Sequence, residues 1–366
     1  VGSEMCIRDR LYTCLKEVDT MARNQKPKKD SLITLTRKYA NNHDECVKFF
    51  FKMKWPVGFY CEKCGCTHYY SIKRGDVFQC KECGHQHYLL SNTIFQDNKL
   101  DLYKLILGMY LFFTANKGLS AIELANELEI NYKTALLLCR KCRILMSQSN
   151  SEKILDSFFY EADVAYIGSK SKEEHKQGVA TEQQPFLVML STDKENKYPK
   201  FLKLMPVAVD STNNIVRFIS KKAILSKERI LNTDGKTTFL GLTDKITLKS
   251  EKILYDEENH RLYWLNVLIG DIKNNITGIY HGVTKRDLPL FLNEQEWRFN
   301  HRYTGKNFMN KIQKYVLKSH PCPKKAIITV LNLSEPYYAH VSDCLLYTSE
   351  PTRLRCISYA VFCLKK

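Results

Sequence analysis

The chain has 366 residues, of which 44% are hydrophobic and 26% charged, a composition typical of a globular protein with two or three domains. Its net charge of +17 favours a polyanionic partner such as nucleic acid. No apolar run approaches the roughly 20 residues that span a bilayer, and the 14 cysteines occur without a secretory signal, so we expect no membrane association and a reducing, cytoplasmic setting.

Both ends of the chain resemble translated adapter sequence, so we leave them out of the functional argument. This applies to residues 1–20, which begin VGSEMCIRDR, and to part of the tail 319–366. Residues 21–58 are expected to form a basic N-terminal arm with a short helix at 44–53. Pro56 ends that helix, because its ring disfavours helical geometry at the preceding residue.

Residues 59–92 contain two Cys-x-x-Cys knuckles that are separated by 15 residues, and each knuckle is followed by a glycine. This spacing is typical of a structural zinc held by four thiolates. The glycines allow the tight turns that such a site needs. A disulfide pair or four unrelated buried cysteines is the alternative. The predicted ligands of this zinc ribbon are Cys61, Cys64, Cys80 and Cys83.

Residues 93–147 are expected to be helical, because apolar residues recur there at helical spacing. Ser120 and Glu123 have the spacing of a capping box. Segments 120–128 and 132–146 are interpreted as a helix-turn-helix, with Glu129 where a turn glycine is usual; a plain helical hairpin is the alternative. The residues of the second helix expected to contact DNA are Lys133, Arg140, Lys141 and Arg143.

A third Cys-x-x-Cys pair, Cys139 and Cys142, lies within that second helix. No further cysteine pair is left to complete a metal site, so we interpret these two thiols as core residues. The polar residues 148–157 are expected to form a linker to the next domain.

The domain at 158–318 alternates strands and helices. Strands are predicted at 158–167, 185–191, 200–207, 229–233 and 252–255, and helices at 212–223, 237–242 and 262–278. This β-β-β-α-β-α-β-α order is that of the RNase H-like fold. The predicted fold class is therefore multidomain: a zinc ribbon, a helical region, and an α/β domain built on a mixed five-stranded sheet.

Three acidic residues of this domain are candidate metal ligands. Asp163 lies in the middle of an apolar strand, where an unpaired charge is costly to bury. Asp234 ends the fourth strand, although an aspartate there is commonly a turn former or helix cap. Asp271, on a helix packed against the sheet, is the candidate third ligand. Such carboxylates can hold a pair of Mg²⁺ ions, and Lys273 could bind a DNA phosphate from the flank.

Several segments in consistent order resemble one protein family. They are 54–59 (KWPVGF), the four knuckle cysteines, 91–95 (SNTIF), 117–121 (KGLSA), 132–135 (YKTA), Asp163 with 166–168 (YIG), 233–235 (TDG), 278–283 (GIYHGV) and 296–302 (EWRFNHR). Residues from about 46 to 302 thus resemble bacterial insertion-sequence transposases that join a zinc ribbon to an ISXO2-like DDE catalytic domain.

The resemblance implies Mg²⁺-dependent cleavage at terminal inverted repeats, followed by strand transfer into target DNA. Asp163, Asp234 and Asp271 would hold two Mg²⁺ ions, with Lys273 beside them. The DNA-gripping flank would include His281, Arg298 and Arg302, although His281 could instead cap or pack. The expected partners are double-stranded DNA and further copies of the chain, in a homodimer or larger assembly at the bacterial nucleoid.

Asp271 stands where relatives have Glu or Asn, and three further positions depart from the family pattern: Val164, Ser169 and Asn266 stand where relatives commonly have Glu, Gly and His. The alternative function is therefore a catalytically inactive DNA-binding protein, either a decayed transposase or a regulator. A stand-alone RNase H-like nuclease, which would cut without joining, is a third interpretation.

Overall fold

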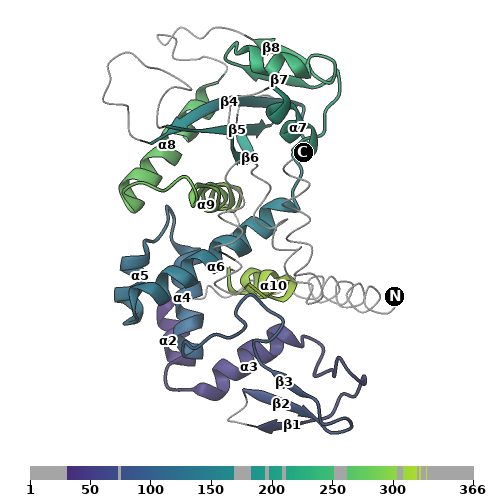
Figure 1. Ribbon diagram of the computed structural model, residues 1–366, viewed down its shortest axis with the longest axis vertical. Helices are drawn as coiled ribbons and strands as arrows, with labels where there is room; N and C mark the ends of the chain where they lie inside the picture. The colour runs from purple at the N-terminus through teal and green to yellow at the C-terminus, as the bar shows by residue number, and fades with distance from the viewer. Residues whose placement is uncertain are drawn as a thin grey trace. The chain divides into compact units, whose positions relative to one another are not determined.

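The computed structural model describes residues 31–72, 76–168, 183–193, 198–207, 212–250, 262–302, 308–319, 321–322 and 327 (Figure 1). The chain forms two compact units. The first comprises Val1–Thr114 with Gly305–Pro321, and the second comprises Ala115–Thr304 with Cys322–Lys366. Among the described residues, none of the helices combines the length and apolarity needed to cross a membrane.

Within its described residues, the first unit contains four helices and a small antiparallel sheet. The helices are α2 (Leu32–Tyr39), α3 (His43–Lys54), α4 (Leu102–Thr114) and α10 (Phe308–Lys318), and the strands are β1 (Tyr69–Ile72), β2 (Val77–Cys80) and β3 (Gln86–Tyr88). As predicted, α3 ends directly before Trp55-Pro56. Helix α2 was missed: Ser31 caps it, and its buried Leu35 and Tyr39 anchor what we had expected to be a loose arm.

Aromatic side chains join α3 to the small sheet. The ring of Phe51 lies 5.0 Å from that of Trp55 and 5.1 Å from that of Phe78. Trp55 in turn lies 5.1 Å from Phe59. Burying large rings in this way supplies much of the apolar stabilisation that a unit with such short strands needs.

The second unit is built on a mixed five-stranded sheet in the order β6-β5-β4-β7-β8. Strand β5 is antiparallel to β4 and β6, whereas β7 is parallel to both β4 and β8. The mixed five-stranded sheet agrees with the prediction, but its fifth strand lies at Thr247–Ser250, where no strand was predicted. The strands are β4 (Phe159–Ile167), β5 (Gln184–Thr192), β6 (Pro199–Pro206), β7 (Ile230–Thr233) and β8 (Thr247–Ser250). The strand predicted at 252–255 lies outside the described residues.

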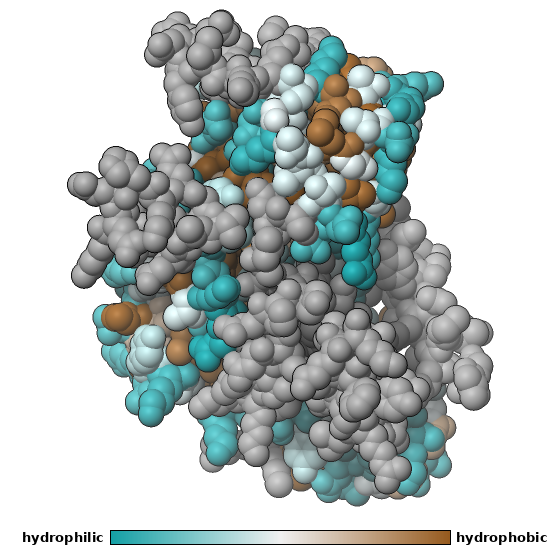
Figure 2. Space-filling view, turned by 45° about the horizontal axis from the view of Figure 1, so that its top comes forward, coloured by the Kyte–Doolittle hydropathy of each residue, from teal (hydrophilic) through white to brown (hydrophobic). Residues whose placement is uncertain are grey.

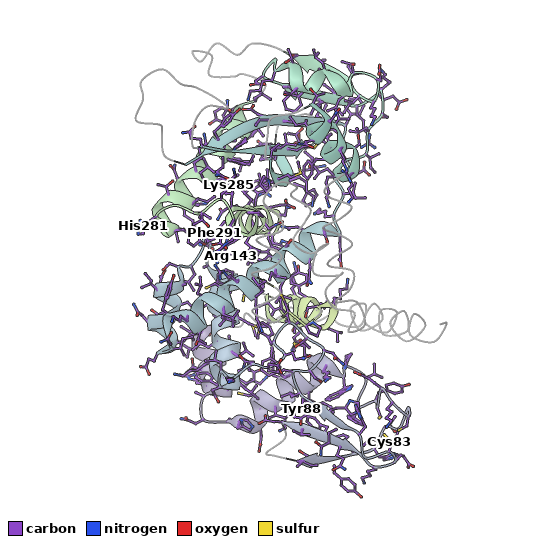
Figure 3. The ribbon with its side chains drawn as sticks, in the orientation of Figure 1. Cys83, Tyr88, Arg143, His281, Lys285 and Phe291 are labelled. Atoms are coloured by element: carbon purple, nitrogen blue, oxygen red, sulfur yellow. The ribbon has the colours of Figure 1, made fainter. Side chains whose placement is uncertain are left out.

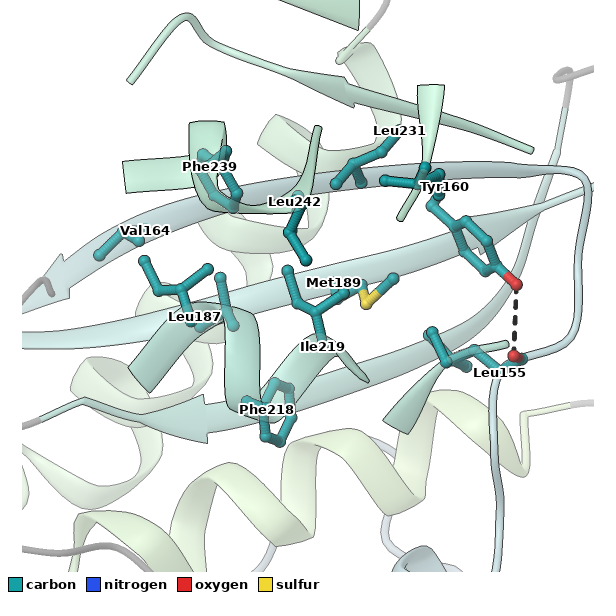
Figure 4. Packing of buried hydrophobic residues seen from close by; sticks show 14 of the residues in the cluster. Leu155, Tyr160, Val164, Leu187, Met189, Phe218, Ile219, Leu231, Phe239 and Leu242 are labelled. Atoms are coloured by element: carbon teal, nitrogen blue, oxygen red, sulfur yellow. Dashed lines mark hydrogen bonds between the residues drawn. The ribbon is translucent and has the colours of Figure 1, made fainter. Parts of the chain in front are cut away.

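Helices cover both faces of this sheet. Helix α7 (Thr212–Lys222) and the 3-10 helix η3 (Thr237–Leu242) pack on the face that carries Tyr160, Ala162 and Val164 (Figure 4). Helices α8 (Tyr263–Tyr280) and α9 (Leu288–Asn300) contribute to the core of the opposite face, with Ala165 of β4. Because side chains alternate along a strand, Asp163 belongs to the face of α8 and α9.

The hydroxyl of Tyr160 closes one edge of the core. Its single O–H is placed to donate to the carbonyl oxygen of Leu155, at 3.3 Å (Figure 4), or to that of Ile224, at 3.1 Å. The hydroxyl of this fully buried ring is therefore satisfied, as a polar atom in an apolar core needs to be.

Helices α5 (Ala121–Leu128) and α6 (Tyr132–Ser151) belong to the second unit, where α6 packs against α5 and α9. The predicted Ser120 cap is present, since its hydroxyl accepts the backbone N–H of Glu123 at 3.1 Å. Glu129 ends α5 in the left-handed conformation, with φ 51° and ψ 53°, which explains why a glycine is usual at this position.

Helix α6 continues through Ser151, although we had predicted a linker from residue 148. For residues 148–151 the prediction was wrong, because none of them is exposed. Asn150 is buried, and its amide donates to the carbonyl oxygen of Asn293 in α9 at 2.8 Å. A buried hydrogen bond of this kind holds the last turn of the helix in place.

The described surface is mixed in character. On the face presented in Figure 2, apolar and hydrophilic residues lie next to one another. The exposed apolar side chains include Val57, Ile122 and Leu240, which come from separate segments of the chain.

Candidate functional site

The four knuckle cysteines converge on one point of the first unit. Their Sγ atoms all lie within 4.8 Å of one another, with 3.6 Å between Cys61 and Cys83 and 3.5 Å between Cys64 and Cys80. Four thiolates around a tetrahedral zinc, each about 2.3 Å from the metal, would lie roughly 3.8 Å apart. The cluster therefore fits a structural zinc ion. Its position in the first unit is marked by Cys83 in Figure 3.

The backbone of each knuckle turns as the sequence predicts. Gly65 and Gly84 have φ values of 79° and 67°, and their N–H groups donate to the carbonyl oxygens of Cys61 and Cys80. The backbone N–H of Cys83 lowers the pKa of Cys80 to about 6, which favours the thiolate that zinc requires.

The zinc cluster also has a neighbour that we did not predict. Nε2 of His87 lies 3.3 Å from Sγ of Cys61, and the His87 side chain is buried. Burial lowers the pKa of His87, so the ring is neutral and can donate one N–H to the sulfur. A hydrogen bond of this kind to a metal-ligating atom fixes the orientation of the ligand side chain.

Cys139 and Cys142 are buried in α6, as expected for core residues. Burial raises the pKa of Cys139 to about 12. In the described part of the chain, the knuckle cysteines form the only group of three or more side chains placed to hold a metal ion.

Asp163, in the middle of β4, lies next to Asp234, which directly follows the end of β7 in the second unit. Strand β4 pairs in parallel with β7, and Ala162 is opposite Thr233, so the next residue on each side is an aspartate. One ammonium group bridges both carboxylates. Nζ of Lys236 lies 2.7 Å from Oδ1 of Asp163 and 3.4 Å from Oδ2 of Asp234.

Further hydrogen bonds fix the two carboxylates. The backbone N–H of Val164 donates to Oδ1 of Asp163 at 2.6 Å, and that of Lys236 donates to Oδ1 of Asp234 at 3.3 Å. Although burial alone would lower it, Asp163 and Asp234 raise the pKa of Lys236, so this lysine is charged. The site can therefore hold a cation between two carboxylates from adjacent parallel strands.

Asp271 and Lys273 lie on α8, which packs against β4 and β5. Asp271 is exposed and Lys273 is half-buried. Within the described residues, Asp271 does not join Asp163 and Asp234 in a group whose ligand atoms all lie within 4.8 Å. The structure thus brings two of the three predicted acidic residues together.

A buried carboxylate, Glu161, attaches α8 to the sheet. It lies two residues before Asp163 on β4, and its Oε2 accepts the backbone N–H of Leu265 at 3.3 Å. Burial raises the pKa of Glu161 to about 7. Because Leu262 provides no side-chain cap for α8, Glu161 supplies an acceptor for the first turn of this helix from the neighbouring strand.

The basic residues of α6 divide into exposed and buried ones. Lys133 is exposed in the first turn, and Arg140 is partly exposed and lies 3.3 Å from Asp287. Lys141 and Arg143 are buried. Nε of Arg143 lies 2.6 Å from Oε2 of Glu294, so this guanidinium belongs to the core and leaves no free surface for a phosphate.

The basic flank of α8 and α9 is also tied into the fold. Arg298 is buried and lies 2.7 Å from Oε1 of Glu294. Arg302 donates to the carbonyl oxygens of Pro199 and Lys200. The backbone N–H of His281 caps the C-terminus of α8, as our alternative interpretation expected. His281 itself is exposed (Figure 3).

Three residues of these networks escaped the sequence analysis: Lys236, Glu161 and Glu294. A signal existed for two of them. Lys236 directly follows Asp234-Gly235, and Glu161 shares a strand face with Asp163 under the two-residue period of a strand. For Glu294 the sequence offers only Arg298, four residues later on the same helix, whereas its other cationic partner, Arg143, comes from a distant segment.

Comparison with known families agrees with this geometry. Residues 156–300 match the ISXO2-like transposase domain, and residues 41–86 match the transposase zinc-ribbon domain. The first match contains the sheet with α8 and α9, and the second contains α3 and both knuckles. No curated protein matches the chain.

Together, a four-cysteine knuckle pair and a DDE-type α/β domain define a transposase. The chain belongs to the insertion-sequence transposases that join a transposase zinc ribbon to an ISXO2-like domain.

Proposed function

We propose that the chain is an active DDE-type transposase, which cuts DNA at the terminal inverted repeats of its element and joins the freed ends to target DNA. One observation carries this proposal: Asp163 and Asp234 come from neighbouring parallel strands and share one bound cationic group. Two carboxylates with that placement are suited to Mg²⁺, which takes oxygen ligands and retains several waters.

In this proposal Asp163 and Asp234 hold Mg²⁺, and Asp271 on α8 is the third ligand. Two such ions would lower the pKa of the attacking oxygen and stabilise the leaving one. In the first reaction, water breaks a phosphodiester bond at the element's end and leaves a 3′-hydroxyl. In the second, that hydroxyl attacks a target phosphodiester, so one bond forms as another breaks. Lys273 contacts DNA phosphate beside the site.

DNA binding would be shared among the zinc ribbon, the helix pair α5 and α6, and the basic flank that includes His281. The first turn of α6 supports this, since Tyr132 and Lys133 are exposed there, and the N-terminal residues of a recognition helix are those that reach base edges. Among the predicted DNA-contacting residues, Lys133, Arg140 and His281 are the ones with accessible surface on α6 and at the end of α8. We also propose that a homodimer or larger assembly pairs two element ends.

The test is cleavage of duplex DNA that carries the element's ends. Asp163→Asn and Asp234→Asn should abolish Mg²⁺-dependent cleavage while DNA binding is retained. The matched control is Asp244→Asn, an exposed aspartate of the same unit that should leave cleavage unchanged. Cleavage by Asp163→Asn at the wild-type rate would remove this residue from the mechanism. Joining of the cut ends to target DNA separates a transposase from a stand-alone nuclease.

A second candidate is a protein that binds the element's ends without cutting them. The position of Asp271 favours it, because this residue is exposed and does not gather with Asp163 and Asp234. Wild-type protein that binds repeat DNA in a salt-sensitive manner, yet yields neither cleaved nor joined products, would establish this function in place of the first.

A further inference from the structure

The ammonium group of Lys236 has three hydrogen-bond donors and three oxygen partners. They are Oδ1 of Asp163 at 2.7 Å, the carbonyl oxygen of Val164 at 2.9 Å, and Oδ2 of Asp234 at 3.4 Å. The first two contacts are hydrogen bonds and the third is an ion pair. The ammonium group therefore lies where the two carboxylates converge.

The chain directs this side chain to the site through a short turn. Gly235, with φ 88°, follows β7, and Lys236 comes directly before η3. The backbone N–H of Lys236 already donates to Oδ1 of Asp234, so main chain and side chain engage the same carboxylate. The backbone of Lys236 is therefore held by Asp234, whereas the four-carbon side chain keeps its rotatable bonds.

We propose that Lys236 is a resident cation, which keeps the two carboxylates together in the metal-free protein and has to withdraw before a divalent metal binds. This inference rests on the proposed function, since it concerns the same carboxylates. The two cations compete for the same oxygen lone pairs. A unit positive charge a few ångströms from a divalent ion also opposes its binding.

The surroundings of Lys236 permit such a withdrawal. Its side chain is 31% exposed, and those of Asp163 and Asp234 are 19% and 27% exposed. The ammonium can therefore reach solvent by rotation of its stem, without opening the core. This is unlike the lysine of the Lys203–Glu296 pair in the same unit, where both side chains are 0% exposed.

The experiment measures Mn²⁺ binding to the full-length, zinc-loaded chain, without DNA, from the electron paramagnetic resonance signal of the free ion. Lys236→Met should bind Mn²⁺ at least about tenfold more tightly than wild type, because a neighbouring positive charge has been removed. Lys236→Arg, which keeps the charge, should bind as wild type does. The matched control is Lys245→Met, a lysine of the same unit whose partner is the Ser220 hydroxyl.

The outcomes separate this inference from the proposed function. If Asp163→Asn loses Mn²⁺ binding but Lys236→Met binds no better than wild type, the resident-cation role is wrong and the metal site remains. If adding Asp163→Asn leaves Mn²⁺ binding unchanged both in the wild type and in Lys236→Met, the proposed metal site itself fails. Lys236→Gln retains hydrogen-bond donors but no charge, so it should bind Mn²⁺ as tightly as Lys236→Met does. It serves as a second variant in case Lys236→Met misfolds. Equal circular dichroism spectra show that the variants are folded like the wild type.

Discussion

Arg143 of α6 and Glu294 of α9 form an ion pair whose Nε–Oε2 distance is 2.6 Å, with side chains only 2% and 0% exposed. The other oxygen of Glu294 lies 2.7 Å from Arg298 and accepts the hydroxyl of Tyr280 at 2.8 Å. The guanidinium of Arg143 also lies 3.9 Å from the ring centre of Phe291, and both residues are labelled in Figure 3. One carboxylate thus holds together α6, α8 and α9.

Glu294→Gln should therefore destabilise the second unit severely. The substitution removes the negative charge that faces two buried guanidinium groups, and breaking a buried pair in this way typically costs about 3–5 kcal/mol. Urea unfolding followed by circular dichroism measures the loss. Asp156→Asn is the control: in its pair with Arg229, the Asp156 side chain is 66% exposed, so a loss of about 1 kcal/mol or less is expected. Equal losses for the two variants would contradict the role given to Glu294.

The same carboxylate should make stability depend on pH. Burial alone would raise the pKa of Glu294, but Arg143 and Arg298 together hold it below its ordinary value of 4.5. A carboxylate with a lowered pKa in the folded state stabilises the protein above its ordinary pKa, and this contribution is lost as the pH falls through the lowered value. The difference in unfolding free energy between wild type and Glu294→Gln should therefore be constant near neutral pH and shrink below pH 4.5.

Zinc content should depend on four particular cysteines. Cys64→Ser should lose the bound zinc, because three thiolates do not complete a tetrahedral site. The neighbouring Cys66 is outside the four-sulfur group, and its Sγ contacts the backbone carbonyl oxygen of His68 instead. Cys66→Ser should consequently retain wild-type zinc, as measured by elemental analysis of the purified protein. Loss of zinc from both variants would indicate a different set of ligands.

Glu161 should be needed as a hydrogen-bond acceptor rather than as a charge. Glu161→Ala leaves the buried N–H of Leu265 without its acceptor, and an unsatisfied buried group costs about 1–3 kcal/mol. Glu161→Gln keeps an oxygen at the same place, so it should retain most of the stability. Hydrogen exchange of amides in the first turn of α8 gives the local readout: faster exchange is expected in Glu161→Ala alone.

Patterns that act over a few residues predicted much of the fold. Strand alternation and turn residues placed β4 to β7, and the cysteine spacing predicted the zinc group. The helix N-cap at Ser120 was also predicted, and its hydroxyl accepts the backbone N–H of Glu123 as expected. Each of these signals is decided by neighbours in the sequence, which is why no structure was needed to find them.

What escaped prediction depends on partners far away in the sequence. The basic residues of α6 predicted a DNA-facing surface, but Arg143 is neutralised by Glu294, which lies 151 residues later. Polar residues 148–157 suggested a linker, but contact with α9 keeps the chain helical as far as Ser151. For the candidate site, Asp163 and Asp234 were predicted as neighbours, whereas the lysine between them was not. Composition cannot distinguish a solvated charge from one that is paired inside the fold.

The first compact unit is assembled from two separate stretches of chain. Helix α10 packs against α3 and α4, and the Ser319 hydroxyl accepts the backbone N–H of Ile94 at 2.9 Å. The 115–304 stretch of the second unit is inserted between these partners. During synthesis on the ribosome, the helices beside the ribbon therefore leave the exit tunnel early but receive their last packing partner only after most of the polypeptide has been translated.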